Sequence, residues 1–110
     1  MDKPDNEQWL EAAGGAVRAR RLANYMAVLP RERLTEILWL VSRSMRETGD
    51  LVAARHHLPD FLRTGHLIAQ SLALPRFMAA FGGSEADLED RFFAEFNLLC
   101  DELRDALAMP

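Results

Sequence analysis

The chain has 110 residues, a formal net charge of −4 and a single cysteine, Cys100. One domain usually holds about 100 to 200 residues, so we expect residues 1–110 to form a single helical domain whose core needs no disulfide. The acidic balance argues against a general polyanion binder. No catalytic or cofactor motif stands out, so we expect no enzyme and no cofactor.

The composition favours helix almost everywhere. Leucine and alanine contribute 17 and 16 residues, whereas valine, isoleucine and threonine together number nine. Leu-Pro pairs at 29–30, 58–59 and 74–75 suit the first turn of a helix, where the missing N–H of proline costs nothing. The sequence therefore predicts an all-α fold, a compact bundle of four main helices plus one or two short helices.

The first half of the chain predicts two long helices. Asp5 can cap a first helical stretch that runs to about Val28 and is weakened or broken at Gly14-Gly15, because two adjacent glycines cost backbone entropy inside a helix. A second helix spans Pro30–Thr48 and ends at Gly49, a residue that suits the left-handed position after a helix.

The second half predicts four more helical segments. Asp50 caps a short helix that ends near His57, Pro59–Leu72 forms the next, and Pro75–Phe81 forms another short one. Ser84 followed by Asp87 resembles a capping box, with Asp in place of the usual Glu or Gln. The last helix should run from there nearly to Ala108.

The second predicted helix carries one large residue outside its apolar stripe. The stripe follows the i, i+3, i+4, i+7 rule, whereas Trp39 lies on the side that carries Arg43 and Arg46. A tryptophan in this position is either covered by another helix of the chain or is an interface anchor, because Trp and Arg are enriched at binding hot spots.

Two further apolar groups leave the same alternatives open. Phe93, Phe96, Cys100, Leu103 and Leu107 repeat at the spacing of a two-helix seam, which another helix of the chain or a twin helix in a homodimer could cover.

The second group is Phe77, Met78 and Phe81 on the short fifth helix, which form either a lid over the core or a partner-binding cluster that reorients beside the following glycines.

No residue group predicts metal or nucleophilic chemistry. His56 and His57 point about 100° apart on a helix, Pro59 separates them from Asp60, and His66 lies at the flank of an apolar stripe. Cys100 lies on an apolar seam, where a thiol has a raised pKa and is inert. We therefore expect no metal site and no catalytic residue.

One segment suggests nucleic-acid binding in outline. Thr48-Gly49, Ala53-Ala54 and a turn before a further helix resemble the helix-turn-helix of the factor-for-inversion-stimulation class. The alanine pair comes too early, and Leu58-Pro59 occupies the turn. The resemblance implies a recognition helix at 59–72, but that helix has no basic run to contact phosphates. DNA binding is kept as an alternative function.

The most concrete functional hypothesis is a non-enzymatic, cytoplasmic antiactivator or adaptor. It would dock on a transcriptional regulator or signalling protein, block its assembly or DNA binding, and form a homodimer, with no membrane contact. A bundle holding a small apolar ligand between Phe61, Phe77 and Phe92 is a third alternative. The predicted protein-interface residues are Trp39, Arg43, Arg46, Phe77, Met78, Phe81, Phe93, Phe96, Leu103 and Leu107.

Overall fold

The computed structural model of the chain describes residues 5–109, the side chain of Tyr25 excepted. Within these residues there are six α-helices and no strand, which confirms the predicted all-α fold. Residues 1–4 and 110 of the predicted domain 1–110 lie outside the described part. The helices are α1 (Asn6–Ala23), α2 (Pro30–Thr48), α3 (Val52–His57), α4 (Phe61–Leu72), α5 (Pro75–Phe81) and α6 (Glu85–Ala108), with a 3₁₀ turn η1 (Tyr25–Ala27) between α1 and α2.

Local sequence signals account for most helix boundaries. α2, α5 and α6 have the predicted bounds. Gly49 ends α2 in the left-handed conformation, with φ of 75°. At the start of α6, the Ser84 hydroxyl accepts from the Asp87 N–H, and the Asp87 carboxylate accepts from the Ser84 N–H, both at 3.1 Å. This reciprocal pair is a capping box, which satisfies two backbone donors that the helix itself leaves free.

Two predicted boundaries were wrong by a few residues. The first helix ends at Ala23 rather than Val28, because Asn24 is extended and its side chain accepts from the N–H of Met26, which starts the separate turn η1. The fourth helix begins at Phe61 rather than Pro59, because residues 58–61 form a turn closed by the Phe61 N–H and the Leu58 carbonyl.

The predicted break at Gly14-Gly15 was also wrong, since α1 is continuous through both glycines. Gly14 is buried where α1 meets α2, and a Cβ placed there would lie 2.2 Å from the Cβ of Trp39. Gly15 has open space around it. The packing of the helix against α2 therefore outweighs the entropic cost of the two glycines.

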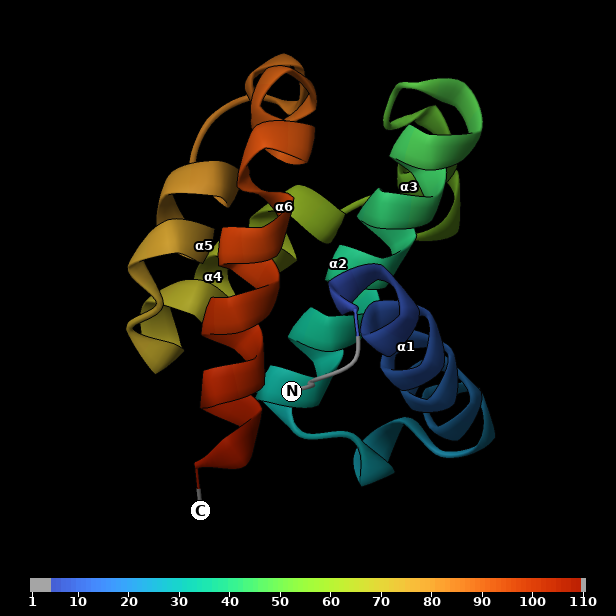
Figure 1. Ribbon diagram of the computed structural model, residues 1–110. Helices are drawn as coiled ribbons and strands as arrows, with labels where there is room; N and C mark the ends of the chain where they lie inside the picture. The colour runs from blue at the N-terminus through green and yellow to red at the C-terminus, as the bar shows by residue number, and fades with distance from the viewer. Residues whose placement is uncertain (1–4, 110) are drawn as a thin grey trace.

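α2 is the central element of the bundle. It contacts α1, α3, α4 and α6. In Figure 1, α6 crosses the front and α4 runs behind it, with α5 to one side and α1 and α2 to the other. The core lies between α2 and α6 and includes the fully buried rings of Phe61, Phe77 and Phe92. No helix within residues 5–109 is both long and apolar enough to cross a membrane.

Polar pairs fix the register of α1 against α2. The ion pairs, taken from the end of α1 toward its start, are Arg20–Glu32, Arg18–Glu36, Glu11–Arg43 and Glu7–Arg46. Between the second and the third pair, Gly14 packs against Trp39. The numbers fall on one helix as they rise on the other, so the two helices run antiparallel. An exposed ion pair contributes only about 0–1 kcal/mol to the free energy of unfolding. The exposed pairs therefore contribute more to the register of the two helices than to the stability of the fold.

Candidate interaction surface

The C-terminal half of α2 presents the two arginines of the predicted interface to solvent. The Arg43 guanidinium carbon lies 5.1 Å from the centre of the Trp39 ring, and that of Arg46 lies 4.8 Å from Phe96 and 5.5 Å from Phe93. Such cation–π contacts contribute about 0.5–1 kcal/mol at exposed sites. The arginines therefore close over aromatic rings of their own chain.

Most of the predicted interface aromatics belong to the core. Trp39 is partly buried beneath α1, so another helix of the chain covers it, as one of its two alternatives proposed. The rings of Phe77 and Phe81 stack with centroids 5.7 Å apart, so α5 covers the core in this structure. Met78 and Leu107 pack at the edge of the core. The predicted interface residues that are fully inside are Phe77, Phe81, Phe96 and Leu103.

Phe93 is the exposed member of the predicted seam on α6. Its side chain is 55% exposed, and its ring meets that of Phe92 edge-on at 5.2 Å. Cys100 of the same seam is fully buried, and burial raises the pKa of its thiol to about 12. The seam is thus mostly covered by the chain itself, and Phe93 is the part that remains open to another molecule.

A buried carboxylate joins three arginines near the start of α2. Glu36 is fully buried, and Arg21 binds it through Nε at 2.5 Å and Nη2 at 2.7 Å. Arg18 and Arg33 approach the same carboxylate at 3.4 and 3.7 Å. Burial and the neighbouring Arg21 lower the pKa of Arg33, while the hydrogen bond to Glu36 raises that of Arg21. The single negative charge of Glu36 faces three positively charged guanidinium groups, so this part of the molecule carries excess positive charge.

Three exposed apolar side chains lie near that positively charged region, at the end of α1 and on the connection to α2. Leu22 in the last turn of α1 is 66% exposed, and Met26 and Leu29 on the connection are 76% and 53% exposed. A shallow cleft of about 400 Å³ adjoins them, with Val28, Pro30 and Ile68 among its lining residues and Arg21 and Arg33 at its wall. We call Leu22, Met26, Leu29 and this cleft the connection surface. Figure 1 places η1 at the lower edge of the molecule, away from α6.

Hydrogen bonds hold the connection in one conformation. The Glu32 carboxylate accepts from Arg20 at 2.8 Å and from the N–H of Leu29 at 3.0 Å. These two bonds, the Arg20 bond first, lower the pKa of Glu32. The N–H of Ala27 donates to the carbonyl of Asn24. A docking segment held in this way loses little conformational entropy when it binds.

The sequence prediction missed the connection surface. The sequence predicts one helical stretch to about Val28, whereas in the structure Met26 lies in the separate turn η1 and Leu29 precedes α2 in an extended conformation. The available signal was the run of apolar residues directly before Pro30, which a helix start leaves in an extended segment. Periodicity within helices does not identify an apolar residue that lies between them.

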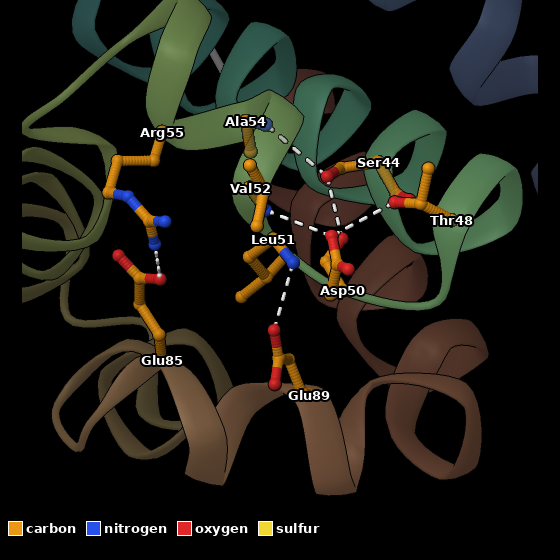
Figure 2. A network of polar contacts seen from close by, with 9 residues as sticks. All are labelled: Ser44, Thr48, Asp50, Leu51, Val52, Ala54, Arg55, Glu85 and Glu89. Carbon is orange, nitrogen blue, oxygen red and sulfur yellow. Dashed lines mark hydrogen bonds and ion pairs between the residues drawn. The ribbon is translucent and has the colours of Figure 1, made fainter.

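The turn between α2 and α3 forms a network that belongs to the fold. Figure 2 shows the Ser44 hydroxyl donating to the carbonyl of Asp50 at 2.6 Å and accepting from the N–H of Ala54. The Asp50 carboxylate accepts from the N–H of Val52, the first residue of α3. Asp50 therefore binds the start of the helix from the position before the N-cap residue Leu51. These contacts satisfy backbone donors at the start of a short helix.

Two glutamates of α6 bind this turn and the following helix α3. Glu89 accepts from the N–H of Leu51 at 2.9 Å, and Glu85 pairs with Arg55, as Figure 2 shows. On the candidate recognition helix α4, Arg63 is the one exposed arginine, next to exposed Leu67, Gln70 and Ser71. The helix-turn-helix outline therefore has a single arginine, Arg63, on the helix that should enter a groove, whereas DNA affinity rests largely on phosphate contacts.

The polar residues considered for metal chemistry lie apart. His56 and His57 are exposed on α3, whereas His66 on α4 lies near Gly82. Within residues 5–109 no three His, Cys, Asp or Glu side chains gather in a way that could hold a metal ion. Comparison with protein-family models, curated proteins and solved structures gives no match to this chain.

Proposed function

We propose that this chain is a small non-enzymatic protein-binding module that docks through its connection surface. The observation that carries the proposal is the exposure of Leu22, Met26 and Leu29 on eight consecutive residues. Isolated exposed apolar residues are ordinary, but a cluster beside a cleft and rimmed by charge is typical of an interaction site.

The connection surface offers both anchors and orientation. The leucines and the adaptable Met26 would bury in an apolar groove of the partner, and unbranched methionine can fit an irregular one. Arg31, which is partly exposed at the start of α2, would meet a carboxylate of the partner at the rim. Rim charges of this kind mainly set association rate and orientation.

The most concrete form of the proposal is an antiactivator or adaptor. By covering an apolar surface of a transcriptional regulator or signalling protein, the module would block that protein's own assembly or its DNA binding. The contacts of Arg43 with Trp39 and of Arg46 with Phe93 of α6 lie toward the other end of α2 and would extend the interface only if the partner reached across α1.

The test is a quantitative pull-down from a nuclease-treated lysate of the source organism. Tagged wild type is compared with the variant Leu22→Ser/Met26→Ser/Leu29→Ser and with the control Val52→Ser, an exposed apolar residue at the start of α3, which follows the opposite end of α2. All four side chains are exposed, so the fold should persist in every variant. We expect one protein to be retained by wild type and control and reduced at least about tenfold by the triple variant.

Equal retention of every bound protein by the triple variant and the control would contradict docking at this surface. Thermal unfolding of the three proteins, followed by circular dichroism, shows whether the comparison is made between folded chains. If nucleic acid is recovered when nuclease is omitted, and no protein is retained, the DNA-binding alternative replaces the proposal.

A second proposal, homodimerisation through α6, is favoured by the exposure of Phe93. Two copies of Phe93 and the adjoining Arg46 could pack about a twofold axis, which is the commonest symmetry of homo-oligomers. Sedimentation equilibrium of wild type and Phe93→Ser, with Leu98→Ser as the control on another side of α6, tests it. A monomeric wild type at about 100 μM, a concentration well above micromolar dissociation constants, contradicts it.

A further inference from the structure

The cleft of the connection surface joins apolar residues to the arginines around Glu36. It has a volume of about 400 Å³, and its lining residues are Arg21, Val28, Pro30, Arg33 and Ile68. Three of these residues are apolar, whereas the two arginines both belong to the group that surrounds the buried carboxylate. A molecule that enters the cleft therefore meets apolar surface and positive charge together.

Arg33 is the least satisfied of the three arginines around Glu36. Each oxygen of the carboxylate accepts one hydrogen bond from Arg21, at 2.5 and 2.7 Å, and Arg18 reaches it at 3.4 Å. The nearest nitrogen of Arg33 lies at 3.7 Å, which is too long for a hydrogen bond. A guanidinium group has five N–H donors in a fork that matches a carboxylate. Glu36 therefore leaves the donors of Arg33 without a bond.

The charge of Arg33 is also poorly compensated. Its pKa is lowered, first by burial and then by the like charge of Arg21, and Glu36 offsets this only in part. A lowered pKa means that the charged form of the side chain is less stable here than in water. The side chain is still 25% exposed, so a carboxylate from another molecule can reach it. Such a carboxylate would stabilise the charged form.

Leu29 and Arg33 place an apolar anchor and this charge one helical turn apart. The N–H of Arg33 donates to the carbonyl of Leu29 at 2.9 Å, so the two residues lie on the same side of the first turn of α2. The carboxylate of Glu32 already accepts from the Leu29 N–H and from Arg20. A partner that covers Leu29 also shields Arg33 from water, and burial of an arginine without a carboxylate is costly.

We propose that the partner of the connection surface is a protein segment that carries an Asp or a Glu beside apolar residues, an inference that rests on the proposed docking at this surface. The apolar residues of the segment cover Leu22, Met26 and Leu29. Its carboxylate enters the cleft and accepts hydrogen bonds from Arg33. Charge complementarity of this kind fixes the orientation of the partner and disfavours a segment with a basic residue at the same place.

The contacts favour a protein segment over an anionic membrane. Segments that bind anionic lipids present clusters of roughly four to eight Lys or Arg side chains. Beside the connection surface, Arg20 is already bonded to Glu32 and Arg21 to Glu36. Arg33 lies in the wall of a cleft, which a single carboxylate side chain can enter more easily than a layer of lipid headgroups. The available charge is therefore local and suits one acidic residue.

The test is a selection of peptides from a random library displayed on phage. Phage that bind the triple variant Leu22→Ser/Met26→Ser/Leu29→Ser are removed first, so the peptides selected on wild type are those that need the connection surface. We expect them to share an Asp or a Glu next to apolar residues. In fluorescence anisotropy, Arg33→Gln should weaken their binding at least about tenfold, whereas Arg55→Gln, at an exposed arginine of α3, should leave it unchanged.

A matched change in the peptide shows whether the two charges meet. When the shared acid is replaced by the corresponding amide, wild type should bind at least about tenfold more weakly, and Arg33→Gln should then cause no further loss, because the pair is already broken. Arg33→Gln leaves both bonds between Arg21 and Glu36 in place, so the fold should persist. Thermal unfolding followed by circular dichroism checks this.

The inference is overturned if the selected peptides share no acid, or if Arg33→Gln binds them as wild type does. It is also overturned if no peptide depends on the three apolar residues. If wild type then sediments with vesicles of phosphatidylserine and phosphatidylcholine, and the triple variant does not, an anionic membrane replaces the protein segment. Failure of the docking itself is seen separately, as equal retention of the triple variant and Val52→Ser in the lysate comparison.

Discussion

Alanine at the two adjacent glycines of α1 should change stability in opposite directions. A Cβ added at Gly14 would lie 2.2, 2.4 and 2.8 Å from the Cβ, Cγ and Cδ1 of Trp39, whereas one added at Gly15 would meet nothing within 4 Å. The Trp39 Cβ is attached directly to the backbone of α2 and cannot rotate away. Gly14→Ala must therefore push α1 and α2 apart by about 1 Å, which a close-packed interface resists.

The expected magnitudes follow from packing and propensity. Overpacking of this kind costs about 1–3 kcal/mol, and a still closer contact costs more. The higher helix propensity of alanine returns about 1 kcal/mol at either position. We therefore expect Gly14→Ala to lower the free energy of unfolding by about 1–2 kcal/mol and Gly15→Ala to raise it by about 0.5–1 kcal/mol.

Urea denaturation followed by circular dichroism measures both variants against wild type. For a chain of this size, each kcal/mol also changes the melting temperature by about 4–8 °C, so the two variants should melt on opposite sides of wild type. If Gly14→Ala proves as stable as Gly15→Ala, α1 does not lie against Trp39 as described.

Two further predictions concern buried polar groups. Glu36→Gln should lower the free energy of unfolding by about 3 kcal/mol, because it leaves three arginines without their buried carboxylate, whereas Glu47→Gln at an exposed pair should change it by less than about 0.5 kcal/mol. Equal effects in urea denaturation would show that the Glu36 cluster is solvated. Burial raises the pKa of Cys100 to about 12 from an ordinary value of 9.0, so the folded chain retains the thiol proton more tightly than the unfolded chain does. The stability that this provides is complete below pH 9 and is lost as pH rises toward 12, so the free energy of unfolding should fall less steeply over that range in Cys100→Ala than in wild type, and parallel slopes would refute the shift.

Much of the secondary structure could be predicted because the signals are local. Pro30, Gly49 and the Ser84–Asp87 capping box act within one turn of the chain, and they set the ends of α2 and the start of α6 as expected. The apolar stripe of α2 is likewise a property of one helix and its 3.6-residue period. None of these inferences required knowledge of a neighbouring element.

The interface prediction shows where such signals stop. Phe77, Phe81 and Phe96 are aromatic residues of the kind that is common in binding surfaces, yet all three are buried. Helical periodicity indicates that a face of a helix is buried, but not whether the same chain or another molecule buries it. The chain folds so that α5 and α6 bury these rings themselves. Conversely, the sequence predicts Met26 within a helix, and the structure leaves it exposed on the separate turn η1 because Asn24 ends α1 early.

The sequence by itself determined the all-α class, the positions of most helix ends and the inertness expected of Cys100, since each depends on residues close together in the chain. Only the tertiary structure decided that Gly14 serves a close helix contact, that Glu36 collects three arginines, and that the Trp39 indole N–H is buried without an acceptor among the described residues. These features depend on which faces of α1, α2 and α3 meet, and contacts between residues distant in sequence are set by packing of the whole chain.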